Sequence, residues 1–133
     1  MTREHHLNGE RVSENWDTVF KALSSEPRRQ LVVSLLDTGP GRSVDLPECA
    51  TMPNVPPEPA PFRLELCHVH LPMLADMGFI TFETEPFVAS RGPNFDEVAV
   101  VFEALHEKST EMPDSLVYGC QRLERERQNS VNP

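Results

Sequence analysis

Apolar residues recur at helical spacing in the first third of the chain. Ser13 is placed to cap a helix, and one face of the helix that follows carries Trp16, Val19, Phe20 and Leu23. The run breaks at residues 24–27 and restarts, with Pro27 in the first turn of a second helix, where its missing N–H costs nothing. That second helix presents Leu31, Val32, Leu35 and Leu36 and ends near Gly39. We therefore predict two helices joined by a tight turn.

The pattern becomes irregular after residue 40. Residues 42–45 predict a very short strand, and residues 46–50 predict one or two helical turns. Five of the nine residues at 53–61 are proline. Proline lacks the N–H that helices and sheets require, so we predict a stiff, extended connector there.

Helical character resumes at residues 62–77, where one face holds Leu64, Cys67, Leu71 and Leu74. Pro72 lies inside this run and predicts a kink or a late helix start. Gly78 is placed to end the helix. Residues 79–83 then alternate as a strand, and residues 87–90 return after a turn, so we predict a β-hairpin over 79–90.

A further apolar helix is predicted from Asn94, which forms a capping-box-like pair with Glu97. Its stripe consists of Phe95, Val98, Ala99, Phe102 and Leu105. Met112 and Pro113 interrupt it, and residues 115–127 predict a charged terminal helix with a weak seam of Leu116, Cys120 and Leu123. The order of elements predicts an α+β fold, a winged helix-turn-helix with a C-terminal helix. The predicted boundaries are a disordered arm at 1–12, the domain at 13–110 and a helical extension or tail at 111–133.

The composition indicates the surroundings in which the protein works. The 133 residues suit one core, and the net charge is −9, from twenty-one acidic and twelve basic residues. An acidic surface poor in lysine is typical of proteins adapted to concentrated salt, and the alternative is an acidic protein that binds a basic partner. No apolar run approaches a membrane span, so we expect a cytoplasmic protein. Three widely spaced cysteines, Cys49, Cys67 and Cys120, suit reduced thiols better than disulfides.

Two stretches carry a family resemblance. Residues 19–29, VFKALSSEPRR, look like the opening of arsenic-repressor-like (ArsR-like) regulators, and residues 68–80, HVHLPMLADMGFI, are similar to the recognition-helix-to-wing segment of a largely uncharacterised haloarchaeal winged-helix group. The resemblance covers about residues 14–108. It implies an often dimeric regulator of transcription that places the helix around residues 64–77 in the major groove. The sequence departs from that pattern at Met73, where many relatives have lysine, in the outward Glu65 and Asp76, and in the proline-rich insert.

The predicted function is therefore binding of double-stranded DNA by a homodimer, and the alternative is a winged-helix adaptor that binds protein without DNA. Phosphate contact needs positive groups, and the candidates for DNA binding are Arg28, Arg29, Arg63, His68, His70 and Arg91. Against DNA stand the acidic residues Glu65, Asp76, Glu83 and Glu85 on the same predicted surface. The candidates for the dimer interface are Trp16, Phe95, Val98, Phe102, Leu105, Leu116 and Leu123.

Other chemistry finds little support in the sequence. Cys67 and His70 are spaced to bind one metal ion, but two ligands do not hold a metal specifically. A buried thiol beside a hydrogen-bonded histidine explains the two residues as well. The adjacent His5 and His6 lack a third ligand on a rigid element. The chain has no glycine-rich phosphate loop and no hydrolase motif, so we expect neither an enzyme nor a cofactor.

Overall fold

The computed structural model describes residues 2–51, 57–118 and 120–131. It divides into two compact units, Met1–Val98 and Ala99–Pro133. The division falls within helix α5 (Phe95–Glu107). The fold is α+β, with a small antiparallel sheet in the first unit.

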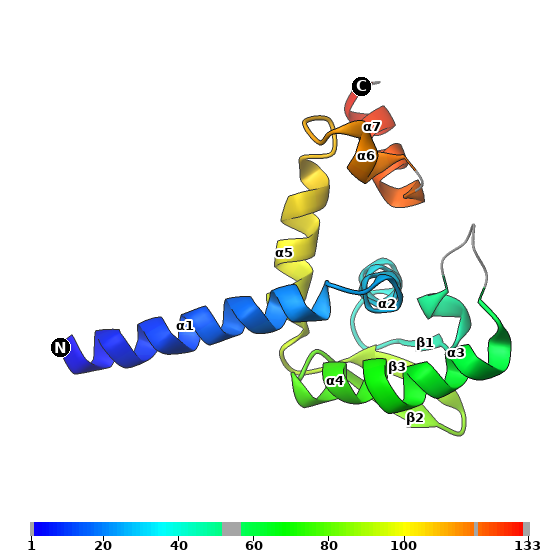
Figure 1. The fold of residues 1–133 in the computed structure, drawn as a ribbon, viewed down its shortest axis with the longest axis horizontal. Coiled ribbons are helices and arrows are strands. Elements are labelled where there is room, and N and C mark those ends of the chain that lie inside the picture. The colour runs from blue at the N-terminus through cyan, green and yellow to red at the C-terminus, as the bar shows by residue number, and fades with distance from the viewer. Residues whose placement is uncertain (1, 52–56, 119, 132–133) are drawn as a thin grey trace. The chain divides into compact units, whose positions relative to one another are not determined.

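Two helices open the first unit (Figure 1). Helix α1 covers Thr2–Ala22, so the arm predicted at 1–12 is helical from Thr2 onward and not disordered. Helix α2 covers Glu26–Thr38 and begins after Ser25, whose extended backbone and the following Pro27 suit a helix start. It ends at Gly39, where φ is 94°, a backbone conformation that glycine adopts more readily than any other residue.

Three short strands form one antiparallel sheet in the order β1-β3-β2. Strand β1 is Ser43–Asp45, β2 is Ile80–Thr84 and β3 is Phe87–Arg91. Val44 pairs with Ala89, and Thr84 pairs with Phe87 beside the turn, so the predicted hairpin forms in the predicted place. The 3₁₀ turn η1 (Glu48–Ala50) matches the short helical segment predicted after the first strand.

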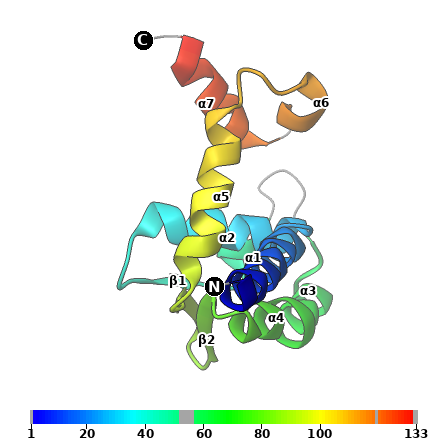
Figure 2. The ribbon, with the colours of Figure 1, turned by 90° about the vertical axis from the view of Figure 1, so that its left-hand side faces the viewer.

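The helix predicted over 62–77 is present (Figures 1 and 2), and one of its turns is irregular. It consists of α3 (Pro59–Glu65), the π turn η2 (Leu66–His70) and α4 (Leu71–Asp76). The N–H of Leu71 binds the carbonyl of Leu66, five residues back. Pro72 follows at once, and a proline ring clashes with the carbonyl four residues earlier in a regular α-helix. The wider turn therefore stands where the sequence predicted a kink, because it accommodates Pro72.

The start of α3 shortens the proline-rich connector. Pro59 occupies the first turn of the helix, so the last three residues of the predicted connector at 53–61 are helical. Residues 52–56 lie outside the described part of the chain.

The core of the first unit lies between α2, the α3–α4 helix and the sheet. Its largest fully buried side chains are Leu31, Leu35, Leu66, Leu71, Leu74, Phe79, Ile80 and Phe95. Gly92 follows β3 where the chain turns toward α5, and its N–H binds the carbonyl of Phe79 at 2.9 Å. A Cβ at this position would lie 2.5 Å from the carbonyl oxygen of Gly78, so only glycine allows this approach.

The second unit contains the rest of α5 with the helices α6 (Asp114–Val117) and α7 (Gln121–Val131). The single helix predicted over 115–127 is therefore two helices, with α6 ending at Val117. The buried apolar side chains described in this unit are Ala99, Phe102, Val117 and Leu123, while Leu116 is exposed. Arg127 donates to the carbonyls of Ser109 and Met112 and to the Asp114 carboxylate. These bonds hold the loop after α5 to α7.

Within the described residues, none of the helices has the length and apolar character that a membrane crossing requires.

Candidate nucleic-acid interface

The candidate interface is the outward surface of the α3–α4 helix and the adjacent β2–β3 hairpin (Figure 2). Two of the predicted DNA-binding residues, Arg63 and His68, are exposed there. The guanidinium carbon of Arg63 lies 4.1 Å from the centre of the Phe87 ring, a cation–π contact that joins α3 to the hairpin. Arg63 therefore sits where the helix and the hairpin meet.

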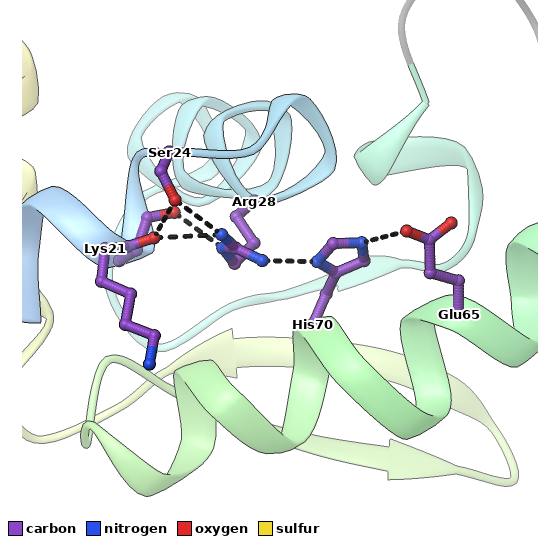
Figure 3. Close-up of polar contacts among 6 residues, drawn as sticks. Lys21, Ser24, Arg28, Glu65 and His70 are labelled. Carbon is purple, nitrogen blue, oxygen red and sulfur yellow. Dashed lines mark hydrogen bonds and ion pairs between the residues drawn. The ribbon is translucent and has the colours of Figure 1, made fainter.

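Arg28 is buried and its guanidinium is used inside the protein (Figure 3). Its side chain is 6% exposed. It donates to the carbonyls of Lys21 and Ala22 and to the Ser24 hydroxyl, each at 3.0 Å, and to Nδ1 of His70 at 2.8 Å. Carbonyls in the last turn of a helix have no partner within the helix, so Arg28 satisfies the end of α1.

Burial lowers the pKa of Arg28, and the charge of Arg29 lowers it further, while Glu65 opposes both effects. The guanidinium stays protonated because its unperturbed pKa is so high. Arg28 is therefore a buried positive charge with its donors directed at neutral acceptors.

His70 links Arg28 to the helix of the candidate interface. The residue is 4% exposed, and Nε2 lies 3.1 Å from Oε1 of Glu65. A guanidinium can only donate hydrogen bonds, so Nδ1 must be the acceptor. The proton of the neutral ring is therefore on Nε2, which donates to Glu65 (Figure 3).

The π turn explains how Glu65 reaches His70. In a regular α-helix, residues five apart point about 140° away from each other. The wider turn over Leu66–His70 brings the two side chains together on one side of the helix. The sequence did not predict this pair because we assumed a regular helical period over residues 62–77.

Two further arginines also bind helix ends. Arg29 donates to the carbonyl of Leu23 at 2.6 Å and to the carboxylate of Glu26 at 2.7 Å. Burial raises the pKa of Glu26, but hydrogen bonds from Gln30 and Arg29 and the charge of Arg29 outweigh it, so the net shift is downward. Arg91 donates to the carbonyl of Leu35 at 3.0 Å and lies over the ring of Phe95.

Four of the six predicted DNA-binding residues are thus engaged within the chain. We withdraw Arg28 and His70 because they are buried. Arg29 and Arg91 are partly exposed and stay predictions, although each donates to a helix carbonyl. Arg63 and His68 are exposed. The exposed acidic residues of the same surface are Glu65, Asp76, Glu83 and Glu85.

The predicted dimer residues also divide by burial. Phe95, Val98, Phe102 and Leu123 are buried within the chain, and we withdraw them from the interface set. Trp16, Leu105 and Leu116 remain exposed. These three side chains are the predicted interface residues that a partner can still contact.

The proposed weak metal ligands do not form a site in the described residues. Both ring nitrogens of His70 are hydrogen-bonded, and Cys67 is a half-buried free thiol. No group of three histidine, cysteine, aspartate or glutamate side chains in this part of the chain is arranged to hold a metal ion. His5 and His6 lie in helix α1, not in an irregular arm.

Comparison of the chain with protein-family models, with curated proteins and with solved structures finds no match. Inference about function therefore depends on the arrangement of the α3–α4 helix, the hairpin and their exposed side chains.

Proposed function

We propose that the unit Met1–Val98 is a winged-helix domain and that the chain is a dimeric DNA-binding regulator of transcription. In this proposal the α3–α4 helix is the recognition helix and the β2–β3 hairpin is the wing. The observation that carries it is the outward Arg63 and His68 on a helix that runs directly into a hairpin. A helix in this setting is suited to the major groove, with the hairpin beside the phosphate backbone.

Each exposed residue has a chemical role in this proposal. Arg63 has donors for a phosphate or for the acceptor edge of guanine, and His68 can meet a base edge. The Arg28–His70 bond is a positioning contact, because it fixes the recognition helix against the junction of α1 and α2.

The surrounding charge sets the conditions for binding. Exposed Asp76, Glu83 and Glu85 repel phosphates at low salt, whereas at about 1 M salt screening acts over roughly 3 Å. With few cations per copy, few counterions are released, so we expect a shallow dependence of affinity on salt.

The test is a gel-shift and fluorescence-anisotropy titration against genomic fragments, including the chain's own promoter region, in molar potassium chloride. We expect the affinity for a retarded fragment to fall about tenfold or more in Arg63→Gln, because one charged contact is lost. Lys108→Gln is the matched control, since it removes one exposed positive charge from the second unit. The proposal fails if the unmodified chain retards no fragment, or if both variants lose affinity equally.

A protein-binding adaptor is the second candidate, and one observation favours it. Leu64 and Val69 are exposed on the same helix as Arg63, next to the acidic residues described above. Apolar side chains flanked by charge suit a protein partner. A pull-down from nuclease-treated lysate separates the two functions. An adaptor keeps its partner and loses it in Leu64→Glu, whereas a DNA-binding protein retains nothing after nuclease treatment.

A further inference from the structure

The second unit buries two polar side chains whose hydrogen-bonding atoms are unpaired. His106 is 8% exposed and Ser109 is 0% exposed. Neither Nδ1 of His106 nor Oγ of Ser109 has a hydrogen-bond partner among the described residues. Native proteins pair nearly all buried polar groups, because burial removes the hydrogen bonds that such groups make with water. Two such atoms only three residues apart indicate that a ligand joins them.

Both atoms lie on one side of the turn that ends α5. His106 is in the last turn of the helix, and the N–H of Ser109 binds its carbonyl at 3.1 Å. In a turn closed by such a bond across three residues, the first and last side chains lie one above the other. The His106 ring also stacks on buried Phe102, with ring centres 4.1 Å apart, so this side of the turn faces the interior of the unit. One small ligand can therefore meet Nδ1 and Oγ together.

An arginine of α7 gives the surroundings of His106 a positive potential. The guanidinium carbon of Arg122 lies 5.8 Å from the centre of the Phe102 ring, on which His106 stacks. Burial lowers the pKa of His106, and the charge of Arg122 lowers it further. A cation that opposes protonation of the ring also attracts an anion beside it.

A second arginine of α7 lies beside Ser109. Nε of Arg127 donates to the Ser109 carbonyl at 3.0 Å. Arg127 also pairs with the carboxylate of Asp114 at 2.8 Å, so part of its charge is offset. The Asp114 side chain is 68% exposed, whereas the Arg127 side chain is 21% exposed. The more buried guanidinium acts more strongly on the interior, which again favours an anion.

We propose that His106 and Ser109 bind a chloride ion. At pH 7.5 the His106 ring is neutral and carries one proton, which makes Nδ1 a donor when the proton is on that nitrogen. The Ser109 hydroxyl is the second donor, and a chloride ion accepts both bonds. Buried neighbours in the unit are apolar, among them Phe102, Val117 and Leu123. A phosphate or carboxylate would bring further oxygens that this apolar lining leaves unpaired, so the geometry favours a monatomic anion.

The proposed site lies in the second unit and requires no DNA, so its test is independent of the proposed function. Chlorine-35 NMR of the full chain at pH 7.5 measures binding directly. The total potassium salt is held at one molar, with acetate in place of chloride. We expect an excess line width that saturates with chloride and falls at least tenfold in Ser109→Ala and in His106→Phe. Ser115→Ala, at an exposed serine of the same unit, is the matched control and should keep the full excess.

Stability distinguishes a bound ion from a purely structural role of these residues. An ion that binds only the folded unit raises its folding equilibrium constant about tenfold for each tenfold rise in chloride above the dissociation constant. Hydrogen exchange of the α7 amides should slow accordingly in the unmodified chain and should not respond to chloride in Ser109→Ala. Without chloride, Ser109→Ala should be at least as stable as the unmodified chain, because it removes a buried hydroxyl that has no partner among the described residues.

Three results would overturn the proposal. The first is an unmodified chain without excess line width, which would mean that water meets the two polar atoms. The second is an excess that survives in Ser109→Ala or in His106→Phe, which would place the ion elsewhere. The third is equal protection of α7 by chloride and by acetate, because general screening would then be the cause.

Discussion

Arg28 donates a hydrogen bond to His70 over 2.8 Å, and this contact joins residues 42 positions apart in the chain. The same guanidinium satisfies carbonyls at the end of α1, while the same imidazole donates to Glu65 on α3. One arginine and one histidine therefore fix three helices relative to each other. Both residues belong to the motifs that suggested DNA binding, yet their side chains serve the interior.

Replacing Arg28 should destabilise the first unit. Arg28→Met keeps most of the apolar volume but leaves the Ala22 carbonyl and Nδ1 of His70 without a donor, whereas the Lys21 carbonyl keeps the hydroxyl of Ser24. Unsatisfied buried polar groups cost about 1–3 kcal/mol each, so we expect a loss of roughly 3 kcal/mol in the free energy of unfolding. Denaturant titration followed by circular dichroism measures it. Arg42→Met, at an exposed arginine, should change stability by less than about 0.5 kcal/mol.

Arg91→Lys should loosen the hairpin. The Arg91 guanidinium reaches the carbonyls of Leu35 and Leu36 at the end of α2 with two of its nitrogens. A lysine has a single ammonium and no planar fork, so we expect a loss of about 1 kcal/mol. Hydrogen exchange of the β3 amides should become faster, whereas exchange in α7 should not change. Equal acceleration in both places would contradict this account.

Gly92→Ala should be strongly destabilising. The added Cβ would meet the Gly78 carbonyl oxygen at 2.5 Å and the Ile80 nitrogen at 2.7 Å, both in the backbone. The junction between the hairpin and α5 must shift, and we expect a cost of about 2–4 kcal/mol. Gly9→Ala is the matched control, because open space surrounds it on α1 and alanine favours helix. Thermal unfolding should show a large fall for the first variant and none for the second.

Acid should weaken the second unit through His106. Burial lowers the pKa of His106 from 6.5 to about 4, and the charge of Arg122 adds to the effect. Between these two values the unfolded chain binds a proton that the folded unit does not. Stability is therefore unaffected above pH 6.5, falls as the pH is lowered toward 4, and then levels off. Allowing for solvent near the ring, we expect a loss of roughly 1–2 kcal/mol.

The variant His106→Phe isolates this effect. It preserves the stacking on Phe102, and Nδ1 of His106 makes no hydrogen bond in the described residues that the change would remove. Unfolding of this variant, measured from pH 8 to pH 4, should lose that part of the pH dependence. The exposed His68→Gln variant should keep it. An unchanged profile in His106→Phe would rule out His106 as the source.

The sequence carried most of the information about local structure. Pro27 and Gly39 marked the ends of α2, and the alternation of residues 79–83 marked the hairpin, because these residues restrict the backbone directly. It could not show where Arg28 and Arg91 point, since a positive side chain suits a phosphate and a helix carbonyl equally well. Only the tertiary arrangement decides between these acceptors.

Two errors have similar causes. We predicted that the first helix starts at Ser13, but α1 starts eleven residues earlier, at Thr2. The residues before Ser13 do not repeat apolar side chains at helical spacing among themselves. The Glu65–His70 pair was missed because a pattern of 3.6 residues per turn does not describe a π turn.

The π turn Leu66–His70 holds one residue more than a regular helical turn, so the side chains before it and after it are offset around the helix axis. Arg63 lies before the turn and Asp76 lies after it, so the side chains at the two ends are rotated relative to one another by an amount that a regular helix would not give. Removing one residue from the turn would rotate Arg63 away from Phe87. The length of this helix, counted in residues, is thus as much a determinant of its outer face as the identity of the residues.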